Sequence, residues 1–232
     1  MIRQKIETQT ARAGVIGLGY VGLPLMVTIA KAGFPVTGID ISRRKVECIQ
    51  GGISDIADIP SETLAPFVQR GQIQATTDYQ VLSELDTVNI CVPTPLRKSK
   101  DPDMSFIIAA VDAIAQYIHK GQLIILESTT YPGTTEEIVL PTLQKSGLRV
   151  GKDFFLAFSP ERIDPGNQTY STANTPKIVG GITPACTEIA QIFYEQFINK
   201  VHVVSSTRAA EMVKLLENTF RSVNIGLVNE MA

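Results

Sequence analysis

The chain has 232 residues, a length that suits one large domain or one and a half ordinary ones. Hydrophobic residues make up 44% and charged residues 19%, a balance that supports a buried core and excludes a disordered chain. The formal net charge of −2 gives no basic field for nucleic acid or for acidic lipid. We therefore expect neither nucleic acid nor a membrane as a partner.

Targeting, disulfide and metal signals are all missing from the pattern of residues. No apolar run reaches the roughly 18–20 residues that span a bilayer, and residues 1–14 lack the apolar stretch of a secretory signal, so a cytoplasmic location is expected. Cys48, Cys91 and Cys186 lie far apart without CxxC or Cys/His spacing, and there are only two histidines. No disulfide framework, metal site or serine triad is predicted.

Apolar, β-branched runs alternate with helix-length periodic segments along most of the chain. Strands are predicted at residues 14–16, 36–39, 87–92, 123–127, 154–158, 177–179 and 201–204. Helices are predicted at residues 22–32, 42–50, 61–69, 106–119, 134–146 and 184–196. Strands separated by helices imply βαβ crossovers. The predicted fold class is therefore α/β, with a Rossmann-like, doubly wound and mostly parallel sheet.

The last segment reads as one long helix. Ser205, Ser206 and Thr207 offer N-cap oxygens, and residues 208–232 continue without proline to the final residue. Because no stop signal appears, we expect the sequence to be a fragment, with a short terminal helix as the alternative.

The residues GVIGLGYVG place the pattern GxGxxG directly after a short apolar strand and at the start of a helix. Gly17 permits a tight turn, Gly19 leaves no Cβ between the backbone and a diphosphate, and Gly22 lets the helix pack close to the strand. The helix N-terminus then presents free N–H groups to the phosphates. A plain glycine-rich turn is the alternative.

Asp40 ends the next predicted strand, about 20 residues after the glycine turn. A carboxylate there accepts hydrogen bonds from the ribose diol of the adenosine and repels a 2′-phosphate, which favours NAD over NADP. Arg43 and Arg44 could bind that phosphate instead, but they fall in a helix with a solvated face. We expect residues 1–205 to form an NAD-binding domain and residues 206–232 to begin a connecting helix.

Three further segments fall at predicted strand ends, where ligands bind in an open parallel sheet: CVPTP at 91–95, ESTTYPGT at 127–134 and SPER at 159–162. Each could be a simple turn. Lys214 and Asn218, four residues apart, share one helix face, so an ammonium and an amide could converge on one oxygen. A solvated helix face is the alternative for that pair.

The ordered set GLGYVGLPL, GIDIS, CVPTP, ESTTYPGTT, SPERIDPG and EMVKLLEN resembles the UDP-glucose/GDP-mannose dehydrogenase family over nearly the whole chain. CVPTPL followed by PDMS, and SPERIDPGN, look most like the members that oxidise UDP-N-acetylglucosamine. Members acting on UDP-glucose or UDP-N-acetylmannosamine are the alternatives. The resemblance implies an NAD-dependent, four-electron oxidation of the C6 alcohol of a UDP-sugar to the uronic acid, with two NAD per turnover and covalent capture of the aldehyde by a cysteine.

The same resemblance implies roles for individual residues. It places cofactor contacts at Gly17, Leu18, Gly19, Tyr20, Val21, Gly22, Asp40, Lys45, Pro93, Thr94, Ser128 and Thr129. It places substrate contacts at Glu161, Arg162, Lys214 and Asn218. Thr129 would position a water or proton acceptor, Glu161 would handle protons, and Lys214 with Asn218 would stabilise oxyanion charge. A surface ion pair is the alternative for Glu161 and Arg162.

The chain departs from the family pattern at the nucleophile, which lies in a GGxC segment downstream of the Lys/Asn helix. That segment is not in this sequence, and Cys48, Cys91 and Cys186 are not expected to replace it. Some members also carry a second glutamate where this chain has Pro165, preceded by Asp164. We expect a chain that binds NAD but is inactive alone; a different Rossmann dehydrogenase, lacking SPERIDPG, is a further alternative.

The helical segment also predicts an oligomer. Its apolar residues Val213, Leu216, Phe220, Val223 and Leu227 would be exposed unless a partner covered them. A homodimer, or a higher homo-oligomer, through this helix is therefore expected.

Overall fold

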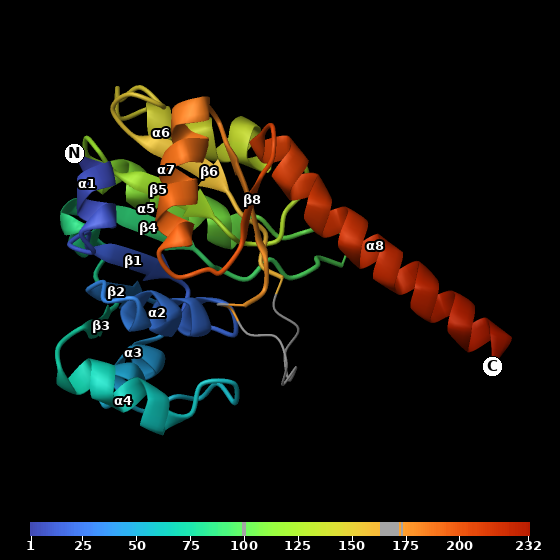
Figure 1. Cartoon of the computed structure of the whole chain (residues 1–232), viewed down its shortest axis with the longest axis horizontal. Coiled ribbons are helices and arrows are strands. Elements are labelled where there is room, and N and C mark those ends of the chain that lie inside the picture. Colours follow the sequence, from blue (N-terminus) through green and yellow to red (C-terminus); the bar gives the residue numbers. More distant parts are fainter. Residues whose placement is uncertain (99–100, 163–171, 173) are drawn as a thin grey trace.

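A computed structural model describes residues 1–98, 101–162, 172 and 174–232, and arranges the described strands in one sheet of order β3-β2-β1-β4-β5-β6-β7-β8 (Figure 1). The strands are β1 Ala13–Ile16, β2 Val36–Ile39, β3 Ile73–Thr76, β4 Thr87–Ile90, β5 Leu123–Leu126, β6 Phe155–Phe158, β7 Lys177–Gly181 and β8 Val201–Val203. Neighbouring strands are parallel except for the antiparallel pair β6 and β7. The predicted doubly wound, mostly parallel sheet is confirmed.

The helices of the described residues lie close to the predicted ones. They are α1 Ile2–Glu7, α2 Gly22–Lys31, α3 Arg43–Gln50, α4 Ser61–Gln69, the 3-10 helix η1 Tyr79–Glu84, α5 Ser105–Tyr117, the π-helical turn η2 Thr135–Val139 leading into α6 Leu140–Gln144, α7 Pro184–Glu195 and α8 Thr207–Met231. The sequence patterns missed α1, β3 and η1. Each of these three elements is four to six residues long, too short for a periodicity to stand out.

The sheet is buried on both faces. In β5, Leu123 and Ile125 point into a core shared with α2 and α7, whereas Ile124 and Leu126 point into a core shared with α5 and α6. Such strands read as continuous apolar runs because side chains on both faces are covered by crossover helices. This arrangement leaves the carboxyl ends of the strands as the open edge of the sheet.

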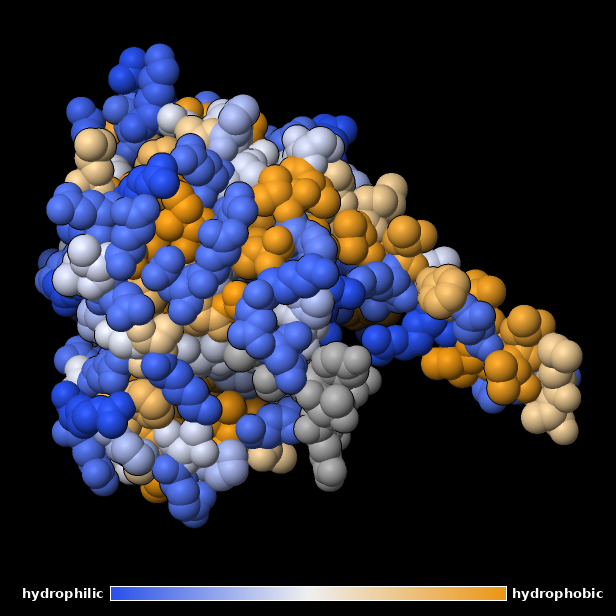
Figure 2. All heavy atoms as spheres, viewed as in Figure 1, coloured by the Kyte–Doolittle hydropathy of each residue, from blue (hydrophilic) through white to orange (hydrophobic). Residues whose placement is uncertain are grey.

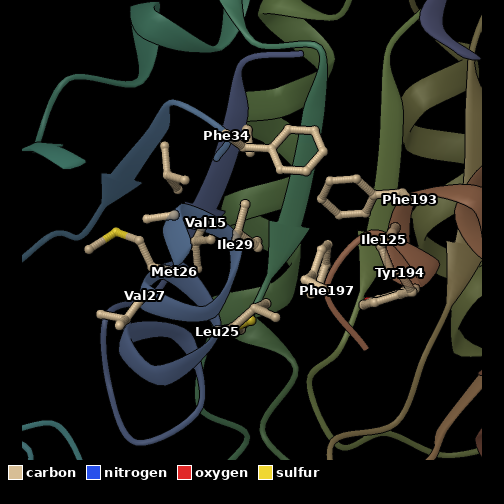
Figure 3. Packing of buried hydrophobic residues seen from close by; sticks show 14 of the residues in the cluster. Val15, Leu25, Met26, Val27, Ile29, Phe34, Ile125, Phe193, Tyr194 and Phe197 are labelled. Carbon is tan, nitrogen blue, oxygen red and sulfur yellow. The ribbon is translucent and has the colours of Figure 1, made fainter. Parts of the chain in front are cut away.

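An aromatic cluster joins α7 to the first βαβ unit (Figure 3). The ring of Phe193 meets Phe34 edge to face, with centroids 5.9 Å apart, and Phe197 in the same manner at 5.0 Å. Such pairs contribute about 0.5–1.5 kcal/mol each beyond the area they bury. The cluster fixes α7 against the segment between α2 and β2.

Helix α8 starts on the body of the protein and projects away from it (Figure 1). The Ser206 hydroxyl caps its first turn by accepting a 3.1 Å hydrogen bond from the amide of Ala209, which identifies Ser206 as the cap among the predicted candidates. Thr207, Ala210 and Glu211 are buried, but residues 218–232 are exposed, and apolar side chains line this part (Figure 2). Across the described ranges, every helix is too short or too polar to cross a bilayer.

Candidate functional site

A cleft of about 860 Å³ opens at the carboxyl ends of the central strands. It lies between β1 and β4, where the order of the strands reverses. The chain adds β2 and β3 on one side of β1, and then β4 and β5 on the other side. This reversal of strand order is the place where doubly wound sheets bind dinucleotides. Its lining comes from the turn between β1 and α2, from the ends of β2, β4 and β5, and from residues of α3, η1 and α5, with Glu161 after β6.

Each of the three glycines of the turn is needed for a different physical reason. Gly17 adopts a φ of +91°, and a Cβ there would approach the carbonyl oxygen of Cys91 to 2.7 Å. A Cβ on Gly22 would overlap the carbonyl oxygen of Gly17. A Cβ on Gly19 would meet only the Lys45 ammonium, 3.9 Å away. The fold itself therefore requires Gly17 and Gly22, whereas Gly19 keeps a lining position of the cleft open.

The backbone amides of residues 19–22 are available at the N-terminus of α2. Among the described residues, none of these four amides has a hydrogen-bond acceptor, and Val21, the N-cap, supplies no side-chain cap. Aligned free N–H groups and the positive end of the helix dipole suit an anion. This is the chemistry that a dinucleotide diphosphate requires.

Asp40 is held rigidly at the end of β2. One carboxylate oxygen accepts a 2.8 Å hydrogen bond from the amide of Leu18, and the other accepts one of 2.8 Å from the amide of Ser42. A carboxylate has about four acceptor positions, so two remain for ribose hydroxyls. Arg43 and Arg44 are exposed on α3 and are not among the described lining residues, which fits NAD better than NADP.

The predicted residues at the ends of β4 and β5 also line the cleft. They are Pro93, Thr94, Ser128 and Thr129. The Ser128 hydroxyl donates a 2.7 Å hydrogen bond to the carbonyl of Val92 and so links the ends of β4 and β5. The oxygen of this hydroxyl can still accept a hydrogen bond, and a contact between Ser128 and the cofactor stays a prediction. Thr129 is exposed to the cleft.

Lys177, at the start of β7, joins two carboxylates of the cleft lining. Its ammonium lies 2.6 Å from Oε2 of Glu127 and 3.0 Å from Oε2 of Glu161. Burial opposes the charge of the Lys177 ammonium, but the two carboxylates outweigh it and raise the pKa of Lys177 above its ordinary value. The sequence reasoning missed this lysine, because its partners are 50 and 16 residues away in the chain.

Two uncharged side chains also donate hydrogen bonds to the carboxylate of Glu127. Its Oε1 accepts hydrogen bonds of 2.6 Å from the Asn89 amide and 2.7 Å from the Tyr194 hydroxyl. Burial raises the pKa of Tyr194, and the charge of Glu127 raises it further, so Tyr194 stays a donor. The signal in the sequence was Asn89 itself, a polar residue inside an apolar strand that needs buried partners.

Contacts of Lys214 and Arg162 attach α8 to the SPER segment, residues 159–162. The Lys214 ammonium donates a 2.6 Å hydrogen bond to the backbone carbonyl of Glu161, and burial lowers the pKa of Lys214. Arg162 lies 2.5 and 3.1 Å from the two carboxylate oxygens of Glu217 and donates to the carbonyl of Pro176. Arg162 therefore forms an ion pair, but its partner is Glu217 of α8, so the pair holds this helix in place.

Glu211, which sequence reasoning also missed, fixes the first turns of α8 to the segment after β5. Its fully buried carboxylate accepts hydrogen bonds of 2.6 Å from the amide of Gly133, 2.9 Å from the amide of Thr135 and 2.7 Å from the Thr135 hydroxyl. Lys214 follows one turn later on the same helix face. The Glu211 contacts therefore set the position of Lys214 relative to the segment 127–135, which contains Thr129.

The structure brings most predicted site residues together in the cleft. Those that line it are Gly17, Leu18, Gly19, Tyr20, Val21, Asp40, Lys45, Pro93, Thr94, Ser128, Thr129 and Glu161. Gly22, Arg162, Lys214 and Asn218 are not among the lining residues, and Asn218 is exposed one turn beyond Lys214. Asp164 and Pro165 lie outside the described residues.

All three cysteines are free thiols. Cys91 and Cys186 are buried and Cys48 is half-buried; burial raises the pKa of the Cys91 thiol, with the Glu127 charge adding to it. Within the described ranges, His, Cys, Asp and Glu side chains form no cluster of three or more that could hold a metal ion.

Comparisons with known proteins agree with this geometry. Residues 11–198 match the NAD binding domain of the UDP-glucose/GDP-mannose dehydrogenase family. The chain is similar to the UDP-N-acetyl-D-glucosamine 6-dehydrogenase of Pseudomonas aeruginosa, with 37% identity over 95% of this chain and 52% of the relative. It is also similar to the UDP-N-acetyl-D-mannosamine dehydrogenase of Pyrococcus horikoshii, with 36% identity over 95% of this chain and 53% of the relative.

The solved structure of the UDP-D-ManNAc dehydrogenase from Pyrococcus horikoshii superposes with a TM-score of 0.89 at 37% identity, covering 94% of this chain and 52% of that one. The chain thus spans about half the length of the curated relatives it matches. With most of its length matched by the family and its glycine turn, Asp40 and strand ends around one cleft, the chain belongs to the UDP-glucose/GDP-mannose dehydrogenase family and carries its NAD-binding domain.

Proposed function

We propose that this chain is the NAD-binding part of an NAD-dependent UDP-sugar 6-dehydrogenase, which oxidises the C6 alcohol to the uronic acid in two steps. One observation carries the proposal: the lining of a single cleft includes the glycine turn and Asp40 together with Glu161, whose backbone carbonyl accepts a hydrogen bond from the Lys214 ammonium. Residues 1–205 form the NAD-binding domain, and residues 206–232 begin a connecting helix. The fold and the comparisons support this division.

The residues of the chain have distinct tasks in that reaction. When bound, NAD supplies the hydride acceptor. The free amides of residues 19–22 bind its diphosphate, and Asp40 accepts hydrogen bonds from its ribose hydroxyls. Thr129, exposed at the end of β5, positions a water or proton acceptor beside the reacting carbon.

Lys214 and Asn218 stabilise the oxyanion that develops at the sugar carbon. Partial burial lowers the pKa of Lys214, so this ammonium releases a proton more readily than an exposed lysine does. Asn218 is exposed one turn further along α8, where a bound sugar could reach it. Glu161 and Arg162 connect this helix to the cleft and contact the substrate.

We propose that none of the three cysteines is the nucleophile that captures the aldehyde. Burial raises the pKa of Cys91, which disfavours the reactive thiolate, and the Cys186 sulfur accepts a hydrogen bond from the amide of Leu156 in the core. The 232-residue chain alone is therefore expected to bind NAD without completing the oxidation. A binding module of this kind is the alternative function for the chain by itself.

UDP-N-acetylglucosamine is the first candidate substrate. It is supported by the segments CVPTPL and SPERIDPGN and by the similarity to the Pseudomonas aeruginosa relative. UDP-N-acetylmannosamine is the second candidate, because the relative named for it is similar to nearly the same extent. UDP-glucose is the third.

The test measures NADH released by the enzyme that contains this chain, with the three UDP-sugars in parallel. We expect about two NADH for each UDP-N-acetylglucosamine consumed and less turnover with the other two sugars. The isolated chain is titrated with NAD by calorimetry and assayed for NADH. NAD binding without NADH production supports the division of labour, whereas one NADH per sugar, or no reaction with any UDP-sugar, would overturn the proposed activity.

A further inference from the structure

The charged side chains that line the cleft fall into two groups. Asp40 follows β2 and Lys45 lies on α3, whereas Glu127 follows β5 and Glu161 lies after β6. The glycine turn and Asp40 take the diphosphate and the adenosine ribose. A dinucleotide bound there would span the reversal of strand order, and its nicotinamide half would then lie on the side of β4 and β5, which Glu127 and Glu161 follow.

Both glutamates form ion pairs with Lys177. Lys177 reaches both carboxylates from β7 and is buried, but it is not among the described lining residues. Lys214 lies beside Glu161 and is likewise outside the described lining. The Glu127 side chain is 0% exposed and that of Glu161 is 10% exposed, so Glu161 is the carboxylate of this pair that a ligand in the cleft can reach.

NAD and NADH differ in charge at the nicotinamide ring, which is a cation in the oxidised form and neutral in the reduced form. A nearby carboxylate attracts the first and has no charge–charge interaction with the second. We infer that Glu161, held in place by its ion pair with Lys177, strengthens binding of oxidised NAD relative to NADH. Lys177 is a positioning residue in this scheme, and Glu161 determines the specificity.

The inference concerns cofactor binding and does not depend on which sugar is oxidised. Its use rests on the proposed function: two oxidations on one substrate require that NADH leave and a second NAD enter. A cleft that favours the oxidised form promotes that exchange.

The test uses the chain and three ligands, NAD, NADH and ADP-ribose, titrated by calorimetry. Glu161→Gln keeps the shape and removes the charge, so we expect NAD affinity to fall about three- to tenfold, as for loss of a partly screened charge pair. Affinities for NADH and for ADP-ribose, which lacks nicotinamide, should stay within about twofold. Glu161→Asp should restore most of the NAD affinity.

Glu188→Gln is the matched control, because Glu188 is an exposed carboxylate on α7 that pairs with Arg3 away from the cleft. Glu161→Ala, which also removes the charge, replaces Glu161→Gln if circular dichroism shows that the latter does not fold. Equal losses for all three ligands, or no loss for NAD, would overturn the inference. So would a chain that binds none of them, whereas failure to oxidise any UDP-sugar would leave these titrations valid and count against the proposed function only.

Discussion

The carboxylate of Asp40 accepts a 2.8 Å hydrogen bond from the amide of Leu18, the residue between the first two glycines of the turn. The residue proposed to bind the ribose therefore also holds the backbone proposed to bind the diphosphate. The two recognition features are 22 residues apart in the chain but form one hydrogen-bonded unit.

Asp40→Ala tests this unit. We expect NAD binding to weaken by about 1–3 kcal/mol, because ribose hydrogen bonds are lost and the Leu18 and Ser42 amides lose their acceptors. Calorimetry measures the affinity. Asp78→Ala is the control, since Asp78 accepts a 2.9 Å hydrogen bond from the amide of Gln80 but is not among the cleft-lining residues. Unchanged affinity in Asp40→Ala would falsify the assignment.

Gly19 and Gly22 should respond in opposite ways to added side chains. Gly19→Val adds atoms where only the Lys45 ammonium is near, so the free energy of unfolding should change little while NAD binding is abolished. Gly22→Ala collides with the Gly17 carbonyl and should lower the free energy of unfolding by about 1–3 kcal/mol. Urea denaturation and an NAD titration of both variants separate the two effects. An intact titration in Gly19→Val would refute the close-approach argument.

Glu211→Ala should loosen α8 from the body. The substitution leaves the amides of Gly133 and Thr135 buried without an acceptor, at a cost of about 3 kcal/mol. Hydrogen exchange at these two amides should accelerate. Glu230→Ala, at an exposed position of the same helix, should change the free energy of unfolding by no more than about 0.5 kcal/mol. Equal effects of the two substitutions would contradict the anchoring role.

The sequence predicted the sheet well because buried parallel strands are continuous apolar runs, as in Leu123–Leu126, LIIL. The edge strand Ile73–Thr76, IQAT, was missed because its buried and exposed positions alternate over four residues only. The glycine turn and Asp40 were predictable because their chemistry lies in local spacing.

The charge network could not be predicted in the same way. Lys177 and Glu127 are 50 residues apart, and only the order of the strands brings them together. Glu211 likewise reaches Gly133 across 78 residues. Asn89, a polar residue between Val88 and Ile90 in a buried strand, indicates locally that a buried hydrogen-bond partner is needed. Its partner Glu127 is 38 residues away and follows from the fold.

The titration of Lys214 checks its environment directly. Burial lowers the pKa of Lys214 from the ordinary 10.5, so its ¹³Cε resonance should titrate at lower pH than those of exposed lysines. The resonance of Lys177 should keep its protonated position as exposed lysines deprotonate, because the two carboxylates raise its pKa. Lys214→Arg and Lys177→Arg assign the two signals. A Lys214 midpoint at or above that of exposed lysines would contradict the proposed environment.

In the enzyme that contains this chain, Lys214→Ala should lower kcat more than it raises KM. In the proposed role the ammonium acts on charge that develops during the reaction, so its loss should affect the transition state more than the bound substrate. Steady-state kinetics with the preferred UDP-sugar measure both constants. A change confined to KM would assign Lys214 to substrate binding instead.

The exposed part of α8 should pair with a second copy of the chain. Leu216, Phe220, Val223 and Leu227 are each more than half exposed and follow the four-three spacing of a helix-pairing seam. We expect a dimer by light scattering, and Phe220→Lys should shift it to the monomer. Ser222→Lys introduces the same charge at an exposed position outside this seam and should leave the dimer intact. A strict monomer at high concentration, or equal disruption by both substitutions, would count against pairing through this face.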